Sequence, residues 1–312
     1  MNIVFFGSPA AALPSFRKLL DGGHSVGLVI TQPDKPAGRG RRMTPSPVKS
    51  FALERGIPVI GPDKIRKDNS VLPRIREAGP DVHVVVAYGQ IIPASIIYYP
   101  RHHSLNVHFS LLPKYRGAAP VQWAVLNGET ETGVTIMELN EKMDEGDILA
   151  QERTRIWPRE TAGELEMRLA DLGADLLLQT LESVDSVPRL PQDHSRASRA
   201  PKIQKEDGRI VWSESAQSID RRIRALAERP GAFTFFKGRR LQIHAGRPLE
   251  AARHGVAPAE ILDADKDGLK VACGAGSVYL IEELQPEGKK RMSAHEFRLG
   301  AKIGPGDLLA EG

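Results

Sequence analysis

Residues 81–87 read DVHVVVA, and this short run decides the fold. Its apolar character over the length of one strand is typical of a strand buried on both faces of a parallel sheet. Similar runs recur on both sides of it, with segments of helical periodicity between them. The expected strands are residues 2–6, 24–30, 57–60, 81–87, 104–109 and 132–139, and the expected helices are residues 12–20, 47–55 and 161–184. This alternation predicts an α/β fold with a Rossmann-like, open and mostly parallel sheet.

The sequence changes character after residue 187. Residues 188–204 are rich in proline, serine and arginine and hold few large apolar side chains, which predicts a linker. Beyond it, short strand-like runs alternate with turn signals, at residues 209–212, 232–236, 240–245, 268–272 and 277–282, with one amphipathic helix at 218–227. Several short strands in succession predict a small, OB-like β-barrel. We therefore expect one domain at 1–187, a linker at 188–204 and a second domain at 205–312.

The composition is that of an ordinary globular protein. Of the 312 residues, 41% are hydrophobic and 26% are charged, which argues against general disorder. The single cysteine, Cys273, excludes a disulfide within the chain and fits a reducing compartment. No apolar run approaches the roughly 20 residues of a membrane span, and the opening MNIVFFGS resembles a core strand rather than a targeting signal. We expect a cytoplasmic protein.

Two common kinds of site are disfavoured. The segment FFGSPAAAL at residues 5–13 has one glycine, Gly7, where a dinucleotide fingerprint needs three. Cys273 has no second cysteine with which to share a metal, and the nine histidines show no spacing typical of zinc ligands. We therefore expect neither a nicotinamide cofactor nor a metal.

Asn106 and His108 lie at the end of the strand expected at residues 104–109. Residues two apart in a strand point to the same face, and ligands of open α/β sheets bind beyond the carboxyl ends of the strands. Asp144 follows in a polar turn, NEKMDEGDIL, at residues 140–149. Alternatively, Asn106 and His108 are a turn former and a buried histidine with satisfied hydrogen bonds, and Asp144 merely favours the turn.

An amide, an imidazole and a carboxylate without a nucleophilic serine or cysteine do not make a hydrolase triad. They suit direct attack of an amine on a carbonyl carbon. In such a reaction Asn106 would donate a hydrogen bond to the developing oxyanion, and His108 would stabilise that oxyanion or shuttle the proton. Asp144 would hold the imidazole and help to take the proton from the amine.

Residues 105–149, LNVHFSLLPKYRGAAPVQWAVLNGETETGVTIMELNEKMDEGDIL, resemble the core of the 10-formyltetrahydrofolate-dependent formyltransferases. The family pattern is Asn, one residue, His, then SLLPxYRG and a later aspartate in a DxGDI turn, and each part is present. The resemblance implies that Asn106, His108 and Asp144 are catalytic and that 10-formyltetrahydrofolate is the formyl donor. It also implies a folate site formed by Val86, Ala87, Tyr88, Gly89, Gln90, Ile91, Ile92, Ser110, Leu111, Leu112 and Pro113.

A basic segment follows the strand expected at residues 24–30. Residues 31–50, TQPDKPAGRGRRMTPSPVKS, are long for a connection and carry five basic residues against one acidic residue. The segment resembles an insertion by which family members that formylate methionyl initiator tRNA contact the acceptor stem. That resemblance implies tRNA binding by Lys35, Arg39, Arg41 and Arg42, through guanidinium–phosphate contacts where the residue is arginine. An ordinary solvated basic loop is the alternative.

The predicted second domain is also basic. Residues 202–250 hold eleven basic and six acidic residues, an excess larger than the net charge of +4 of the whole chain. Residues 200–212, APKIQKEDGRIVW, resemble the junction into the C-terminal β-barrel of the family. Because basic barrels commonly bind oligonucleotides, the resemblance implies a tRNA-binding domain.

The resemblance thus implies an enzyme that transfers the formyl group of 10-formyltetrahydrofolate to the α-amine of methionyl initiator tRNA, for translation initiation. We also expect it to be monomeric and free of metal. One alternative is a formyltransferase that acts on a small amine such as an amino-sugar nucleotide, which would leave the basic segments unused. Another is an RNA-binding or folate-storing protein that keeps the fold without catalysis. Binding alone does not require Asn106, His108 and Asp144 to converge.

Overall fold

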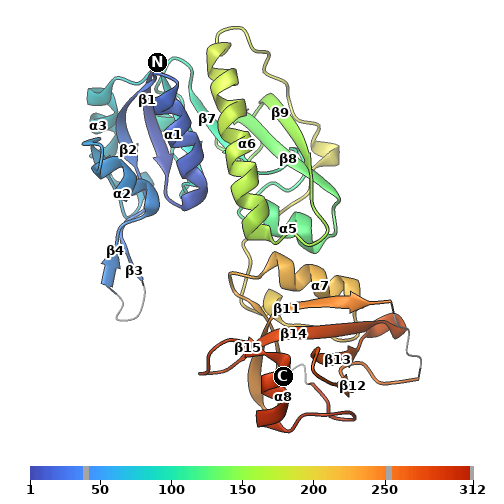
Figure 1. The fold of residues 1–312 in the computed structure, drawn as a ribbon. Coiled ribbons are helices and arrows are strands. Elements are labelled where there is room, and N and C mark those ends of the chain that lie inside the picture. The colour runs from blue at the N-terminus through green and yellow to red at the C-terminus, as the bar shows by residue number, and fades with distance from the viewer. Residues whose placement is uncertain (38–41, 251–254, 310–312) are drawn as a thin grey trace. The chain divides into compact units, whose positions relative to one another are not determined.

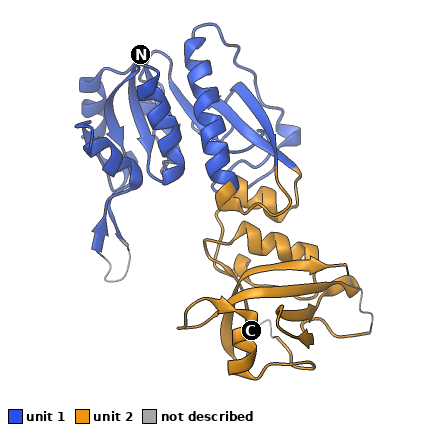
Figure 2. Cartoon of the chain, in the orientation of Figure 1, with its two compact units in different colours: residues 1–120, 131–155, 165–201 blue, residues 121–130, 156–164, 202–312 orange. Residues whose placement is uncertain are grey.

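The chain, described by a computed structural model over residues 1–37, 42–250 and 255–309, folds into two compact units (Figure 2). The first unit comprises residues 1–120, 131–155 and 165–201, and the second comprises residues 121–130, 156–164 and 202–312. Most of the predicted linker, residues 188–201, therefore belongs to the first unit. The units also alternate along the chain between residues 121 and 164, which a single boundary near residue 190 does not describe.

The first unit is built on a seven-stranded sheet with the order β5-β2-β1-β6-β7-β8-β9 (Figure 1). Its strands are β1 (Asn2–Gly7), β2 (Ser25–Ile30), β5 (Val59–Ile60), β6 (Val82–Val86), β7 (Ser104–His108), β8 (Glu131–Glu138) and β9 (Ile148–Arg155). The pairs from β5 to β7 are parallel, whereas β8 and β9 are antiparallel. All residues of β6 are buried. The prediction of an open, mostly parallel α/β sheet is confirmed.

Helices cover this sheet, and three of the helices are not expected from the sequence. Before residue 188 the helices are α1 (Leu13–Asp21), α2 (Pro47–Leu53), α3 (Val71–Ala78), α4 (Ala94–Ile97), α5 (Pro120–Leu126) and α6 (Ala162–Glu182). Those missed are α3, α4 and α5. With four residues α4 is too short to display a helical period, whereas α3 and α5 are no shorter than the predicted α2. Ile75 of α3 and Ile96 of α4 nevertheless enter the apolar core formed with β1, β2 and β6.

The second unit is built on an antiparallel sheet with the order β10-β11-β14-β13-β12, and β15 pairs with β14. Its elements are α7 (Ala216–Ala225), β10 (Ala232–Phe236), β11 (Arg239–Leu249), β12 (Ile261–Ala264), β13 (Leu269–Ala272), β14 (Val278–Pro286), β15 (Met292–Ser293) and α8 (Ala294–Ala301). Within the described ranges, no strand ladder joins the edge strands β10 and β12. The small β-sheet is confirmed, and its closure into an OB-like barrel stays a prediction.

The prediction of a strand at residues 209–212 is wrong. Arg209 makes one isolated bridge to Phe233, while Ile210 and Trp212 are buried in the core of the second unit. Nε1 of Trp212 donates a hydrogen bond to Oγ1 of Thr234 at 3.0 Å. The alternation of apolar residues therefore reflects the burial of an irregular segment, which periodicity does not distinguish from a short strand.

The basic segment at residues 31–50 forms a short hairpin between β2 and α2. Strand β3 (Lys35–Ala37) pairs with the antiparallel strand β4 (Arg42–Thr44). An ion pair of 2.8 Å between Asp34 and Lys49 joins the two ends of the segment. Helix α2 then begins at Pro47, with the hydroxyl of Ser46 accepting a hydrogen bond from the backbone N–H of Lys49 as an N-cap.

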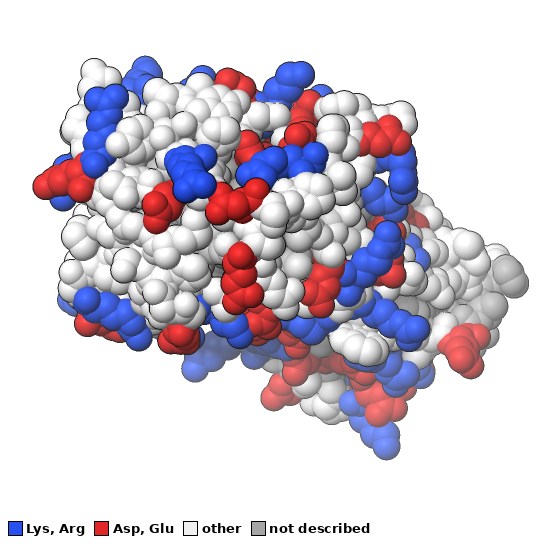
Figure 3. Space-filling model, turned by 90° about the horizontal axis from the view of Figure 1, so that it is seen from above, with Lys and Arg blue, Asp and Glu red and all other residues white. Residues whose placement is uncertain are grey.

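The surface carries charges of both signs. On the face drawn in Figure 3, Lys and Arg side chains lie among Asp and Glu side chains. That face therefore lacks the unbroken basic surface that phosphate binding favours. Over the described ranges, no helix combines the length and apolarity needed to cross a membrane.

Candidate active site

Strand β7 carries Asn106 and His108 on one face. His108 is 6% exposed, and its Nε2 lies 3.0 Å from the carbonyl oxygen of Tyr115. Because a carbonyl oxygen only accepts hydrogen bonds, the neutral ring carries its proton on Nε2. The other ring nitrogen, Nδ1, is then left to face Asp144 and to accept a proton. The side chain of Asn106, which is partly exposed, makes no hydrogen bond to any residue that the structure describes.

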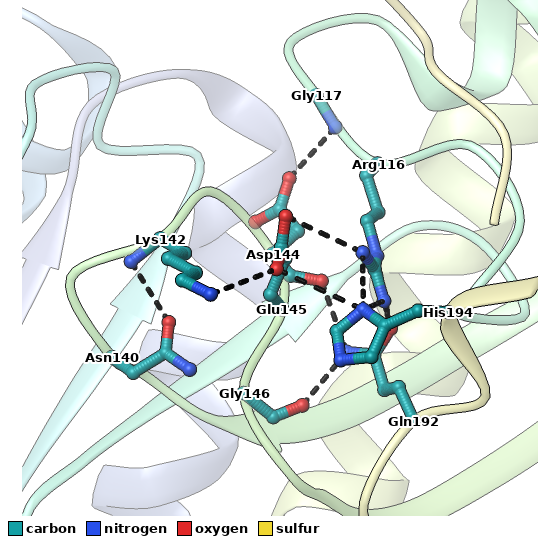
Figure 4. Close-up of polar contacts among 9 residues, drawn as sticks. All are labelled: Arg116, Gly117, Asn140, Lys142, Asp144, Glu145, Gly146, Gln192 and His194. Carbon is teal, nitrogen blue, oxygen red and sulfur yellow. Dashed lines mark hydrogen bonds and ion pairs between the residues drawn. The ribbon is translucent and has the colours of Figure 1, made fainter.

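The structure brings Asp144 to His108. Oδ2 of Asp144 lies 3.8 Å from Nδ1 of His108, and the Asp144 side chain is 14% exposed. The same oxygen accepts a hydrogen bond of 2.7 Å from the backbone N–H of Gly117 (Figure 4). A separation of 3.8 Å exceeds a hydrogen bond but suits an ion pair with a protonated imidazole.

Two unusual backbone conformations fix the carboxylate. Asp144 has a φ of 53°, in the left-handed region that few residues other than glycine adopt. Gly117 has a φ of 129°, and a Cβ atom there would lie 2.5 Å from the carbonyl oxygen of Ala200. The N–H group that meets Asp144 therefore requires glycine at position 117.

The sheet alone does not bring Asp144 to this place. Strand β8 runs antiparallel to β7 and ends at Glu138, which pairs with Leu105. Leu105 lies three residues before His108, or roughly 10 Å along the strand. The segment 139–147 must therefore fold back towards His108, and hydrogen bonds outside the sheet have to hold it there.

The predicted folate segment at 86–92 begins at the same edge of the sheet as the loop after β7. Strand β6 pairs in parallel with β7 and aligns Val85 with Asn106. The ring of Tyr88 packs edge to face on Phe6 at 5.5 Å, and burial raises the pKa of its hydroxyl group. The Tyr88 hydroxyl has no hydrogen-bond partner among the described residues. Ile91, by contrast, is 54% exposed.

The side chain of Gln90 is occupied within the protein. Its Oε1 accepts a hydrogen bond from the backbone N–H of Ile65 at 2.9 Å, and its Nε2 donates to the carbonyl oxygen of Pro62 at 3.0 Å. Gln90 therefore fixes the loop against the segment after β5. With both ends of its side chain occupied, Gln90 has only its backbone groups to offer to a ligand.

The second predicted folate segment, residues 110–113, is held by a polar network around the buried hydroxyl groups of Ser110 and Thr135. Ser110 donates from its hydroxyl to the carbonyl oxygen of Lys114 at 2.7 Å. The hydroxyl of Thr135 donates to the carbonyl oxygen of Ser110 at 2.7 Å and accepts from the N–H of Leu112 at 3.1 Å. Gln151 donates to the carbonyl oxygen of Leu112 at 2.8 Å. These contacts give the Ser110 hydroxyl a structural partner and fix the shape of the loop.

The residues predicted to bind tRNA are only partly described. Lys35 and Arg42 lie on the exposed hairpin, whereas Arg39 and Arg41 lie outside the described residues. The ammonium group of Lys35 donates to Oε1 of Gln32, and Nε2 of Gln32 donates to the carbonyl oxygen of Tyr88 at 2.9 Å. The base of the hairpin is thereby connected to the predicted folate loop. In the part of the chain that is described, no hydrogen bond or ion pair joins Lys35 or Arg42 to Asn106, His108 or Asp144.

Sequence reasoning missed Gln192, whose amide contacts the turn of Asp144 (Figure 4). It lies in the predicted linker, where a single glutamine between polar residues gives no distinctive signal. Arg116 belongs to the SLLPxYRG pattern, from which no role was predicted for it, yet its guanidinium group binds Gln192 and lies near Glu145. Among the described residues, no group of three or more His, Cys, Asp or Glu side chains could hold a metal ion.

The arrangement can perform acid–base chemistry on an attacking group. Nδ1 of His108 can accept a proton, and the carboxylate of Asp144 stabilises the resulting positive charge. The amide of Asn106, on the same face of β7, can donate a hydrogen bond to an oxygen that becomes negative. All of the groups lie in the first unit.

Comparisons with known proteins cover both units. The model of the family described as formyl transferase matches residues 1–181, and the model of the formyl transferase C-terminal domain matches residues 202–302. A methionyl-tRNA formyltransferase of Geobacter metallireducens is 44% identical over 311 residues, which cover 99% of this chain and 98% of the relative.

Two solved structures share the fold. HypX from Aquifex aeolicus, in complex with tetrahydrofolic acid, matches with a TM-score of 0.64 at 17% identity over 95% of this chain and 46% of HypX. The chain thus spans about half the length of that protein. A methionyl-tRNA formyltransferase from Clostridium thermocellum matches with a TM-score of 0.58 at 16% identity, over 88% of this chain and 100% of that one. On these similarities, the chain belongs to the formyl transferase family.

Proposed function

We propose that the chain transfers the formyl group of 10-formyltetrahydrofolate to the α-amine of methionyl initiator tRNA. The observation that carries the proposal is the convergence of Asp144 on His108, at 3.8 Å, beside Asn106 at the end of β7. Full-length similarity to a methionyl-tRNA formyltransferase supports the choice of acceptor. The folate-bound neighbour in the same fold supports a folate-derived donor.

In the proposed reaction the neutral amine attacks the formyl carbon, and a new C–N bond forms. The amide of Asn106 donates a hydrogen bond to the oxyanion of the tetrahedral intermediate. Nδ1 of His108 takes the proton that the amine releases, and the carboxylate of Asp144 stabilises the imidazolium. The bond between the formyl carbon and N10 of the folate then breaks, and the proton moves from His108 to that nitrogen.

The substrates are assigned to two sets of residues. Segments 86–92 and 110–113 would bind the folate, and Lys35, Arg39, Arg41 and Arg42 would contact the phosphates of the tRNA. The second unit would add a basic surface for tRNA binding. The proposal includes a metal-free, monomeric enzyme that works in the cytoplasm.

The test is a transfer assay with three acceptors. Methionyl initiator tRNA, glycinamide ribonucleotide and an amino-sugar nucleotide are each incubated with the protein and 10-formyltetrahydrofolate. Formylation of the tRNA is followed by acid-gel electrophoresis, and formylation of the small amines by mass spectrometry. Formyl-methionyl-tRNA as the main product supports the proposal. Transfer to a small amine alone would refute the tRNA acceptor, and folate binding without any transfer would refute the enzymatic function.

A further inference from the structure

One buried glutamine holds the turn that carries Asp144. Gln192 is 6% exposed, and its Nε2 donates to the carbonyl oxygens of Asp144 at 2.9 Å and Gly146 at 2.7 Å (Figure 4). These two bonds hold the backbone on both sides of Glu145. The pairing of β7 with β8 does not fix this turn. These two bonds therefore hold its backbone, in addition to the hydrogen bond that the Asp144 carboxylate accepts from the N–H of Gly117.

The carboxamide of Gln192 has one chemically acceptable orientation. Its Oε1 accepts hydrogen bonds from Nε and Nη2 of Arg116, at 3.1 and 2.8 Å. A guanidinium group only donates hydrogen bonds and a backbone carbonyl only accepts them. The oxygen of the amide must therefore face Arg116, and its two N–H bonds must face the turn.

Arg116 is itself held in place. Its side chain is 10% exposed, and Nη1 lies 3.5 Å from Oε1 of Glu145. Its backbone N–H donates to the carbonyl oxygen of Ser198 at 2.9 Å, and its carbonyl oxygen accepts from the N–H of Ala200 at 2.7 Å. Gln192 thus connects the Asp144 turn to a fixed arginine rather than to a free surface chain.

We infer that Gln192 is a positioning residue for formyl transfer. By holding the carbonyl groups of Asp144 and Gly146, it keeps residue 144 in its left-handed conformation with the carboxylate facing His108. The inference rests on the proposed function, which gives Asp144 its part in proton transfer. Gln192 acts through Asp144 and is placed in contact with no reacting atom.

The first test replaces Gln192 by glutamate, which has nearly the same shape. A carboxylate still accepts hydrogen bonds from Arg116 but donates none to the two carbonyl oxygens. Because small misplacements of catalytic groups cost up to about 10²-fold in rate, we expect kcat to fall between about 10- and 100-fold. The KM for 10-formyltetrahydrofolate should change by less than about threefold, since Gln192 lies outside the segments assigned to folate.

A matched control separates this effect from the change of charge. Gln179 lies exposed on α6 of the first unit, outside every segment assigned to a substrate. Gln179→Glu introduces the same charge there and should leave kcat unaltered. If Gln192→Glu also leaves kcat unaltered while the native protein is active, the inference is wrong.

A double-mutant cycle distinguishes positioning from general damage. If Gln192 acts through Asp144, then Gln192→Glu should have little further effect on kcat in an Asp144→Asn background. Additive losses in the double variant would mean that Gln192 affects the reaction by another route, and would overturn the inference. Should Gln192→Glu fail to fold, Gln192→Met, which keeps the length of the side chain without its polar groups, replaces it in the cycle.

A spectroscopic readout needs no turnover. The ¹H–¹⁵N signals of the His108 imidazole, assigned by their loss in His108→Ala, should move in Gln192→Glu in the same direction as in Asp144→Asn. Unchanged His108 signals in Gln192→Glu would show that Asp144 keeps its place without the glutamine, and the inference would fail. This measurement remains valid even if methionyl-tRNA is not the acceptor, so failure of the inference and failure of the proposed function can be told apart.

Discussion

Replacing Asp144 by asparagine removes the negative charge that faces His108, the proposed proton acceptor, with almost no change in the shape of the side chain. Oδ2 of Asp144 lies 3.8 Å from Nδ1 of His108, and the two side chains are 14% and 6% exposed. At an effective dielectric constant of about 20, a unit negative charge at this distance stabilises an imidazolium by about 4 kcal/mol. At about 1.4 kcal/mol per factor of ten, its loss would lower kcat by at most about 10³-fold. The usual contribution of acid–base catalysis sets the smaller limit at about 10²-fold.

Steady-state kinetics with both substrates measures this change. Asparagine at position 144 can still accept the hydrogen bond from Gly117, so the free energy of unfolding should fall by only about 1 kcal/mol. The KM for 10-formyltetrahydrofolate should stay within about threefold of the native value.

Asp175→Asn is the matched control. It removes one negative charge from the exposed surface of α6, where Asp175 pairs with Lys18. Surface ion pairs of this kind contribute little, so kcat should be unchanged. The reasoning is refuted if Asp144→Asn retains native kcat, or if it loses folate binding, because Asp144 would then build the folate site.

Three further predictions follow from other parts of the molecule. Arg42→Ala, on the exposed strand β4, should raise the KM for methionyl-tRNA and reduce its dependence on salt by about one phosphate contact, with the KM for folate unaltered; an identical salt series would return the hairpin to an ordinary basic loop. Burial lowers the pKa of His83 from 6.5 to about 3. The unfolded chain therefore binds the extra proton first, so stability should be undiminished above pH 6.5 and fall by about 1.4 kcal/mol per pH unit as the pH drops towards 3. Urea titrations of His83→Leu should lack this component, and an equal slope would contradict it. Trp212→Ala should destabilise the second unit by about 3–5 kcal/mol because the indole is 1% exposed in its core; a loss below about 1 kcal/mol in urea unfolding would show that the core repacks.

Most strands of the large sheet could be predicted because burial on both faces leaves a clear apolar run, as in β6. No range was expected for β9, whose residues are mostly exposed or partly buried and form no such run. The short helix α4 could not be predicted either, because it has only four residues and gives a single turn of periodicity. The segment at 209–212 has the alternation of a strand, but its backbone is irregular although the side chains of Ile210 and Trp212 are buried in the core. The local pattern of apolar residues therefore predicts which side chains are buried better than it predicts the backbone conformation.

Part of the candidate site could likewise be predicted from the sequence, and part could not. Asn106 and His108 share a face because a strand has a period of two, so their alignment follows from sequence alone. The approach of Asp144 to His108 was expected from the chemistry of the three side chains and from the family resemblance. The strand order alone does not predict it, since the pairing of β7 with β8 carries the turn away from His108. Gln192 and Asp144 lie 48 positions apart in the sequence and are joined by a hydrogen bond from a side chain. Sequence periodicity does not predict contacts of this kind.

The attachment of residues 188–201 to the first unit decides where the chain can be divided. A fragment that ends at residue 187 would lose Gln192, together with the N–H of Ala200 that binds Arg116 and the hydroxyl of Ser198 that binds the N–H of Tyr115. Such a fragment would keep every strand of the large sheet and also Asn106, His108 and Asp144. The loops that position these side chains would lose the hydrogen bonds that hold them. A truncation that ends at Pro201 would retain the large sheet together with the contacts of Gln192, Ser198 and Ala200. The extent of the first unit beyond α6 is therefore set by the polar contacts of the irregular residues 188–201, and not by any further strand or α-helix.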